Sequence, residues 1–90
     1  MSELSETFMI QNKLGLHARA AALFVKTTSR FSSDVSISAR KQTVNGKSIM
    51  GVLMLAASQG TKVKVTVNGK DAAECLAALS KIIEHKFGEE

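Results

Sequence analysis

The 90-residue sequence contains no proline, tryptophan or tyrosine and only one cysteine, Cys75. A single cysteine excludes a disulfide within the chain, and we expect this thiol to be buried on the apolar side of the last helix. Without Trp, Tyr or a dense Lys/Arg cluster, the chain lacks the stacking platforms and basic stripes of many nucleic-acid-binding proteins, and no nucleic-acid partner is expected. The net charge of +4 favours acidic partners.

Long apolar runs are also absent. The N-terminal stretch MSELSETF is polar and acidic, without the basic and apolar regions of a signal peptide, so we expect a cytoplasmic protein with no membrane partner. Ninety residues with 44% apolar side chains suffice for one modest core, which predicts a single domain over residues 1–90. This size favours a binding or carrier module over an enzyme, and we expect no cofactor and no metal.

Hydrophobic periodicity predicts an α+β domain with the element order βαββαβα. The expected elements are a strand at Thr7–Gln11, a helix over Ala18–Arg30, hairpin strands at residues 34–39 and 40–47, a helix from Ser48, a strand at residues 61–67 and a helix over residues 71–87. The last helix shows one apolar stripe, formed by Leu76, Leu79, Ile83 and Phe87.

A short repeat, VNGKS followed by VNGKD, ends two of the expected strands. In each copy Asn-Gly predicts a turn and the last residue predicts a helix cap, so Ser48 caps one helix and Asp71 forms a capping box with Glu74. The GKS of the first copy is not a phosphate-binding loop, because Lys41 stands where such a loop has its first glycine.

The stretch NKLGLHARAAALFVK contains the main candidate site. Gly15 permits a tight turn, after which His17 falls at a helix start whose first N–H groups have no intrahelical partner. Such a helix start stabilises an anion, and Arg19 can present a planar fork to phosphate oxygens. The arrangement suits a phosphohistidine site in which neutral imidazole is the nucleophile. A histidine cap beside a solvated arginine is the alternative.

Two segments, NKLGLHARAAALFV and VNGKSIMGVLMLAASQG, together with the ending IIEHKFGEE, closely resemble HPr, the histidine-containing phosphocarrier family of the bacterial phosphoenolpyruvate:sugar phosphotransferase system. The resemblance runs from about Phe8 to the C-terminus. It implies an open-faced two-layer sandwich in which three helices cover one face of a four-stranded antiparallel sheet. It also implies that His17 accepts the phosphoryl group and that Arg19 stabilises it.

The resemblance further implies a regulatory serine at Ser48, phosphorylated by an HPr kinase in many bacteria, and an apolar docking patch of Ile49, Met50 and Leu53. The implied partners are enzyme I and an enzyme IIA-type acceptor, with the HPr kinase and a transcriptional regulator as further candidates. The family usually has HARP, whereas this chain has Ala20 in place of the proline. Alanine adds a backbone N–H near the anion site.

Several alternatives stay open from the sequence. The chain could serve sugar uptake or a regulatory nitrogen-linked branch, whose carrier NPr is a close relative of HPr. A small basic nucleic-acid-binding domain and a phosphatase-like enzyme are the other classes. On a helical wheel, Leu23 and Lys26 share a face with Arg19, which predicts either a docking face or an ordinary solvated one. His85 has no neighbouring arginine or glycine turn and is expected at the surface.

Overall fold

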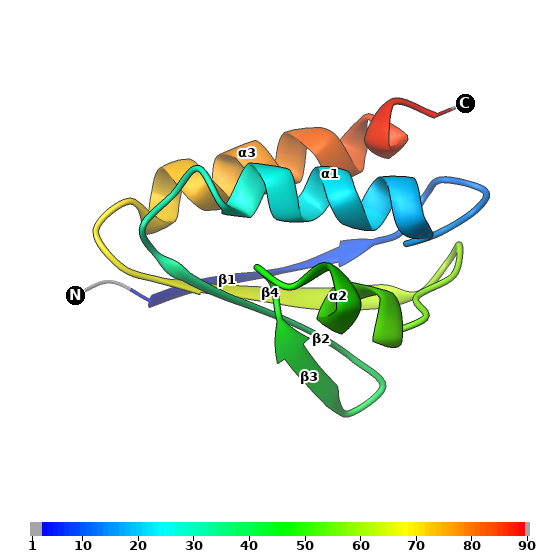
Figure 1. The fold of residues 1–90 in the computed structure, drawn as a ribbon, viewed down its shortest axis with the longest axis horizontal. Coiled ribbons are helices and arrows are strands. Elements are labelled where there is room, and N and C mark those ends of the chain that lie inside the picture. Colours follow the sequence, from blue (N-terminus) through cyan, green and yellow to red (C-terminus); the bar gives the residue numbers. More distant parts are fainter. Residues whose placement is uncertain (1–2, 90) are drawn as a thin grey trace.

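The computed structural model describes residues 3–89 and confirms the predicted order of elements. These are β1 (Glu3–Met9), α1 (Ala18–Thr28), β2 (Asp34–Ala39), β3 (Gln42–Asn45), α2 (Ile49–Met54), β4 (Lys62–Asn68), α3 (Ala72–Glu84) and the short 3₁₀ helix η1 (Lys86–Gly88). Helices α1 and α3 lie side by side above the sheet, and the shorter α2 lies beside α1 (Figure 1).

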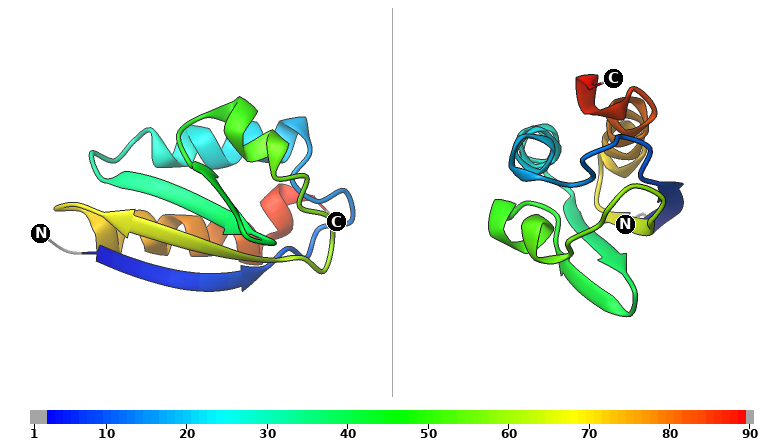
Figure 2. Two further views of the ribbon diagram at one scale, coloured as in Figure 1. Left: turned by 90° about the horizontal axis from the view of Figure 1, so that it is seen from below. Right: turned by 90° about the vertical axis from the view of Figure 1, so that its right-hand side faces the viewer.

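Within residues 3–89, the strands form one antiparallel sheet in the order β1-β4-β2-β3. Strand β4 lies between β1 and β2 and alternates buried and more exposed residues, as its sequence KVKVTVN predicts. The helices cover the face that receives the buried residues, and the opposite face is open (Figure 2). The observed architecture confirms the predicted open-faced two-layer α+β sandwich.

The hydrophobic core joins the covered face of the sheet to all three helices. Phe24 of α1, Val52 of α2 and Leu79 of α3 are each fully buried in this core, which also contains the valines of the sheet. Cys75 is also fully buried, as predicted, and burial raises the pKa of its thiol. The predicted stripe of α3 is confirmed at Leu79 and Ile83, whereas Leu76 lies at the edge of the core. Phe87 is buried as predicted, but it lies in η1, after the end of α3.

Most element boundaries differ from the predictions by a few residues, and three of these differences have a clear structural reason. Strand β1 begins at Glu3 rather than Thr7, because its backbone pairs with β4 along its whole length although only Phe8 is buried. Helix α1 ends at Thr28 rather than Arg30, because the N–H groups of Arg30 and Phe31 bond to carbonyls three residues back, which tightens the chain into a turn. Helix α3 ends at Glu84, after which the chain reverses.

The predicted capping box at the start of α3 is wrong. Asp71 is the N-cap residue, but its backbone is not extended and its side chain makes no cap hydrogen bond. The carboxylate instead accepts hydrogen bonds from the backbone N–H and hydroxyl groups of Ser32 and Ser33. These contacts, led by the Ser33 hydroxyl, lower the pKa of Asp71 to about 2. Asp71 therefore ties the loop before β2 to the start of α3.

Candidate functional site

The turn before α1 is held against the segment that follows α2. The Leu16 N–H donates to the carbonyl of Ala57 at 2.8 Å. Gly15 has a φ of +66°, and a Cβ at this position would lie 2.4 Å from the Ala57 carbonyl oxygen. Only glycine fits both this conformation and this close approach. The turn therefore places the next residues in one defined position at the start of α1.

His17 is the N-cap residue of α1, as predicted. Its backbone is extended, with φ −79° and ψ −177°, and its ring makes no cap hydrogen bond. The first N–H groups of α1 are therefore left without a partner from this side chain, beside an imidazole that is 29% exposed. The alternative in which the ring itself caps the helix is contradicted by this geometry.

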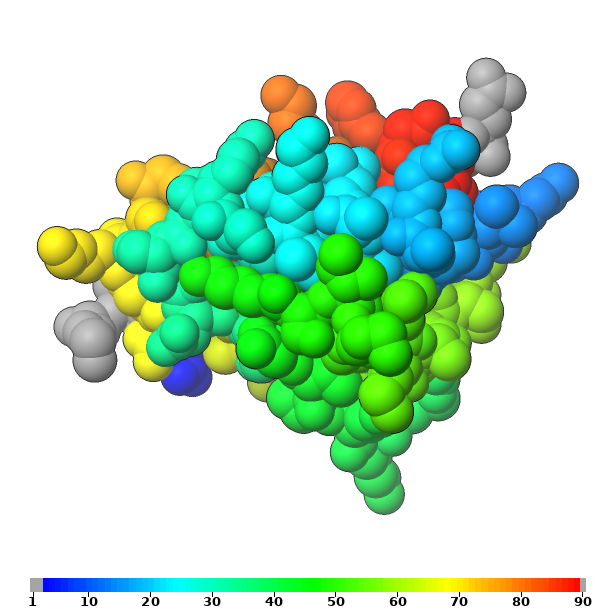
Figure 3. Space-filling view, in the orientation of Figure 1, coloured from blue at the N-terminus to red at the C-terminus, as the bar shows by residue number. Residues whose placement is uncertain are grey.

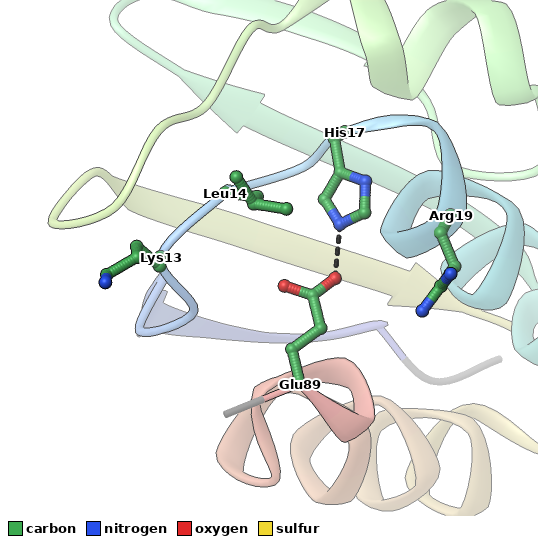
Figure 4. A pocket seen from close by; sticks show the side chains of 5 residues that line it. All are labelled: Lys13, Leu14, His17, Arg19 and Glu89. Carbon is green, nitrogen blue, oxygen red and sulfur yellow. Dashed lines mark hydrogen bonds and ion pairs between the residues drawn. The ribbon is translucent and has the colours of Figure 1, made fainter.

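Glu89 is the site residue that the sequence did not reveal. Its Oε2 accepts a hydrogen bond from Nε2 of His17 (Figure 4). Its Oε1 accepts one from Nδ2 of Asn12 at 3.0 Å. The C-terminal segment thus reaches the ring from 72 positions away in the sequence. Because Nε2 is the donor to Glu89, Nδ1 is the ring nitrogen with a free lone pair.

An open pocket surrounds this contact and is lined by Lys13, Leu14, His17, Arg19 and Glu89. The Arg19 side chain extends from the first turn of α1 toward the same space (Figure 4). The pKa of Glu89 lies below its usual value, because its carboxylate accepts hydrogen bonds from His17 and Asn12 and has Arg19 nearby. The basic side chains around the carboxylate make this a site that favours negative charge.

Ser48 is the N-cap residue of α2, and its hydroxyl accepts a hydrogen bond from the Gly51 N–H at 3.0 Å. The predicted cap is therefore confirmed. Ile49 and Met50, which follow it, are exposed, whereas Leu53 is half-buried and packs against the core. The sequence prediction omitted two further exposed apolar residues, Met54 at the end of α2 and Leu14 beside His17.

The predicted docking face on α1 is only partly exposed. Lys26 and Arg19 are exposed, but Leu23 is half-buried and packs against the core. Leu23 therefore has a packing role, and Arg19 and Lys26 form the exposed part of that face. The surfaces of α1 and α2 are continuous with each other, and the C-terminal segment adjoins the start of α1 (Figure 3).

The remaining candidate groups lie elsewhere. His85 is exposed at the end of α3, as predicted. Among residues 3–89, no three His, Cys, Asp or Glu side chains are close enough together to bind a metal ion. No helix in this part of the chain has the length and apolar character needed to cross a membrane.

The site geometry agrees with three comparisons to known proteins. Residues 4–85 match the family model described as the PTS HPr component phosphorylation site. The chain is an HPr family protein. Phosphocarrier protein HPr of Xylella fastidiosa (strain 9a5c) is 47% identical over 87 residues, which cover 97% of this chain and 98% of that protein. HPr of Neisseria meningitidis serogroup A is 48% identical over 86 residues, which cover 96% of this chain and 97% of that protein.

Among solved structures, HPr-C-His from Thermoanaerobacter tengcongensis superimposes on this chain with a TM-score of 0.91 and is 51% identical in sequence. The matched region covers 100% of this chain and 99% of the chain in that structure. The fold, the family model and the relatives therefore agree along nearly the whole chain. Membership of the HPr family makes this chain a phosphocarrier of the phosphotransferase system, transiently phosphorylated in a relay, rather than an enzyme.

Proposed function

We propose that His17 is the phosphoacceptor and that this chain transfers the phosphoryl group from phosphorylated enzyme I to an enzyme IIA-type acceptor. The position of His17 supports this assignment. Its ring stands at the start of α1, where backbone N–H groups and the positive end of the helix dipole favour an anion. Nδ1 is the nucleophile, because Nε2 is occupied by its proton and Glu89.

Arg19 is proposed to stabilise the transferred phosphoryl group. Its exposed guanidinium lies at the pocket that contains His17, and its planar fork matches the oxygens of a phosphoryl group. Transfer then proceeds in line: the bond from Nδ1 to phosphorus forms while the bond from phosphorus to the donor histidine breaks. The ring remains open enough for a donor and an acceptor protein to reach it in turn, since it is 29% exposed.

Docking is proposed to use the exposed apolar residues of α2, Ile49 and Met50, together with Lys26 on α1. An apolar patch beside exposed basic side chains suits partners with an acidic rim around an apolar centre. Ser48 is proposed as a regulatory phosphorylation site for an HPr kinase, because its hydroxyl is at the edge of this surface. The relay is proposed to operate in the cytoplasm, where enzyme I and the acceptor must both reach the carrier.

The decisive experiment is to mix the protein with phosphoenolpyruvate and enzyme I and to measure intact mass. We expect one acid-labile phosphoryl group on wild type, none on His17→Ala, and wild-type labelling on His85→Ala, the matched control at the exposed histidine. Labelling of His17→Ala equal to that of wild type would refute the assignment. Enzyme IIA proteins of the sugar branch and of the nitrogen-linked branch, offered separately to the labelled carrier, would identify the branch that it serves.

A further inference from the structure

The C-terminal segment turns sharply to reach the site. Lys86, Phe87 and Gly88 have consecutive positive φ values of 55°, 54° and 76°. This conformation is disfavoured for the two residues that have a Cβ. Strained backbone of this kind persists where the surrounding structure imposes it, and it concentrates at functional sites. Phe87 supplies the constraint here, because its side chain is buried in the core and anchors the turn.

The turn places the Glu89 carboxylate within hydrogen-bond reach of two donors, the His17 ring and the Asn12 amide. Glu89 is 13% exposed in its side chain and accepts hydrogen bonds from Nε2 of His17 and Nδ2 of Asn12. Asn12 is fully buried and is itself fixed by a bond of 2.7 Å from Nδ2 to the carbonyl of Gly15. A buried amide therefore holds one oxygen of the carboxylate while the other meets the imidazole. This arrangement restricts both the ring orientation and the position of its proton.

We propose that Glu89 is a positioning residue for phosphoryl transfer at His17, which fixes the imidazole with its proton on Nε2 and balances the charge that the ring gains on phosphorylation. The inference rests on the proposed role of His17 as phosphoacceptor. A carboxylate that orients a catalytic imidazole and stabilises its cationic form is known from serine hydrolases. In this chain the carboxylate of Glu89 would act in the same way on a histidine that is itself the nucleophile.

The charge balance follows from the bonds that change. The Nδ1 lone pair of His17 forms the new bond to phosphorus, and the electron pair of the broken bond returns to the nitrogen of the donor histidine. No proton leaves Nε2, so the phosphorylated imidazole is a cation in contact with the Glu89 carboxylate. A charge-assisted hydrogen bond of this kind stabilises the phosphorylated carrier more than the neutral, unphosphorylated one. Glu89 therefore shifts the transfer equilibrium toward the carrier.

The test compares Glu89→Ala and Glu89→Gln with Glu84→Ala, which removes a carboxylate from the exposed end of α3. The first measurement is ¹⁵N NMR of the unphosphorylated imidazole at a pH where it is neutral, which reports the tautomer without any phosphoryl donor. The second is the equilibrium between the phosphorylated forms of enzyme I and the carrier, read by intact mass. An equilibrium constant between free proteins does not depend on how well they dock, so it isolates the chemistry at the ring.

We expect wild type and Glu84→Ala to carry the proton on Nε2, and Glu89→Ala to show a mixture of tautomers. Both Glu89 variants should lower the equilibrium constant for carrier phosphorylation at least about five-fold, since glutamine lacks the charge, while Glu84→Ala stays within about two-fold. Wild-type ¹⁵N shifts in Glu89→Ala, or an unchanged equilibrium in either Glu89 variant, would overturn the inference. If wild type itself took no phosphoryl group on His17, the proposed function would fail and this inference with it.

Discussion

Replacing Ser48 by aspartate tests whether this cap is also a regulatory switch. The substitution places a negative charge at the N-cap of α2, and Asp caps helices about as well as Ser. The fold should therefore survive, with thermal stability equal to that of wild type or slightly higher. Transfer from enzyme I, in contrast, should slow at least about five-fold, equivalent to about 1 kcal/mol in the barrier.

The structure separates a direct effect on His17 from an effect on docking. The carbonyl of Gly46, two residues before Ser48, accepts a hydrogen bond from the Thr28 hydroxyl at the far end of α1. Because α1 has 11 residues, this end lies about 16 Å from His17. A unit charge at that distance changes the energy of another by only about 0.3 kcal/mol in water, and salt reduces it further. A five-fold defect must therefore arise where the partner covers α2.

Stopped-flow transfer at two ionic strengths, alongside melting curves, would measure both effects. The docking explanation requires a slower bimolecular rate whose defect shrinks as salt screens repulsion from an acidic partner. His17 reactivity toward phosphoramidate, a small donor with a phosphorus–nitrogen bond that needs no docking, should stay as in wild type. Equal transfer rates for wild type and Ser48→Asp would refute the switch and leave Ser48 as a helix cap alone.

Three further substitutions test other parts of the structure. Arg19→Lys should still accept the phosphoryl group from enzyme I but several-fold more slowly, because one ammonium cannot reproduce a bidentate fork; wild-type kinetics would exclude Arg19 from the site. Lys26→Glu should weaken enzyme I binding with normal stability, and an unchanged titration would make this face ordinary solvated surface. Asp71 has a folded-state pKa of about 2, below the ordinary aspartate value of 3.8, so its contribution to stability is complete above about pH 4 and is lost as the pH falls toward 2. Asp71→Asn should therefore melt earlier than wild type at pH 5, and this gap should narrow by pH 2; a constant gap would refute the role of its bonds to Ser33.

Structural features that depend only on neighbouring residues were predicted correctly from the sequence. Gly15 followed by His17 indicated a helix start, and Ser48 indicated a cap, because turn and cap geometry depend on a few adjacent positions. The alternation in β4 and the stripe in α3 likewise identified the buried faces. Asp71 shows the limit of such local rules. Its carboxylate bonds to the loop at Ser32 and Ser33 instead of capping its own helix, since that loop packs against it in the fold.

Glu89 shows why part of the site could not be predicted. No sequence pattern connects an acidic C-terminal residue with a histidine 72 positions earlier; the contact arises from the reversal of the chain after α3 and the burial of Phe87. His17 and its helix start therefore follow from adjacent residues of the sequence, whereas the carboxylate that contacts the imidazole depends on the packing of Phe87. Because Phe87 packs in the same core as the buried residues of α1, the packing that supports the helix start also fixes the position from which Glu89 reaches the imidazole.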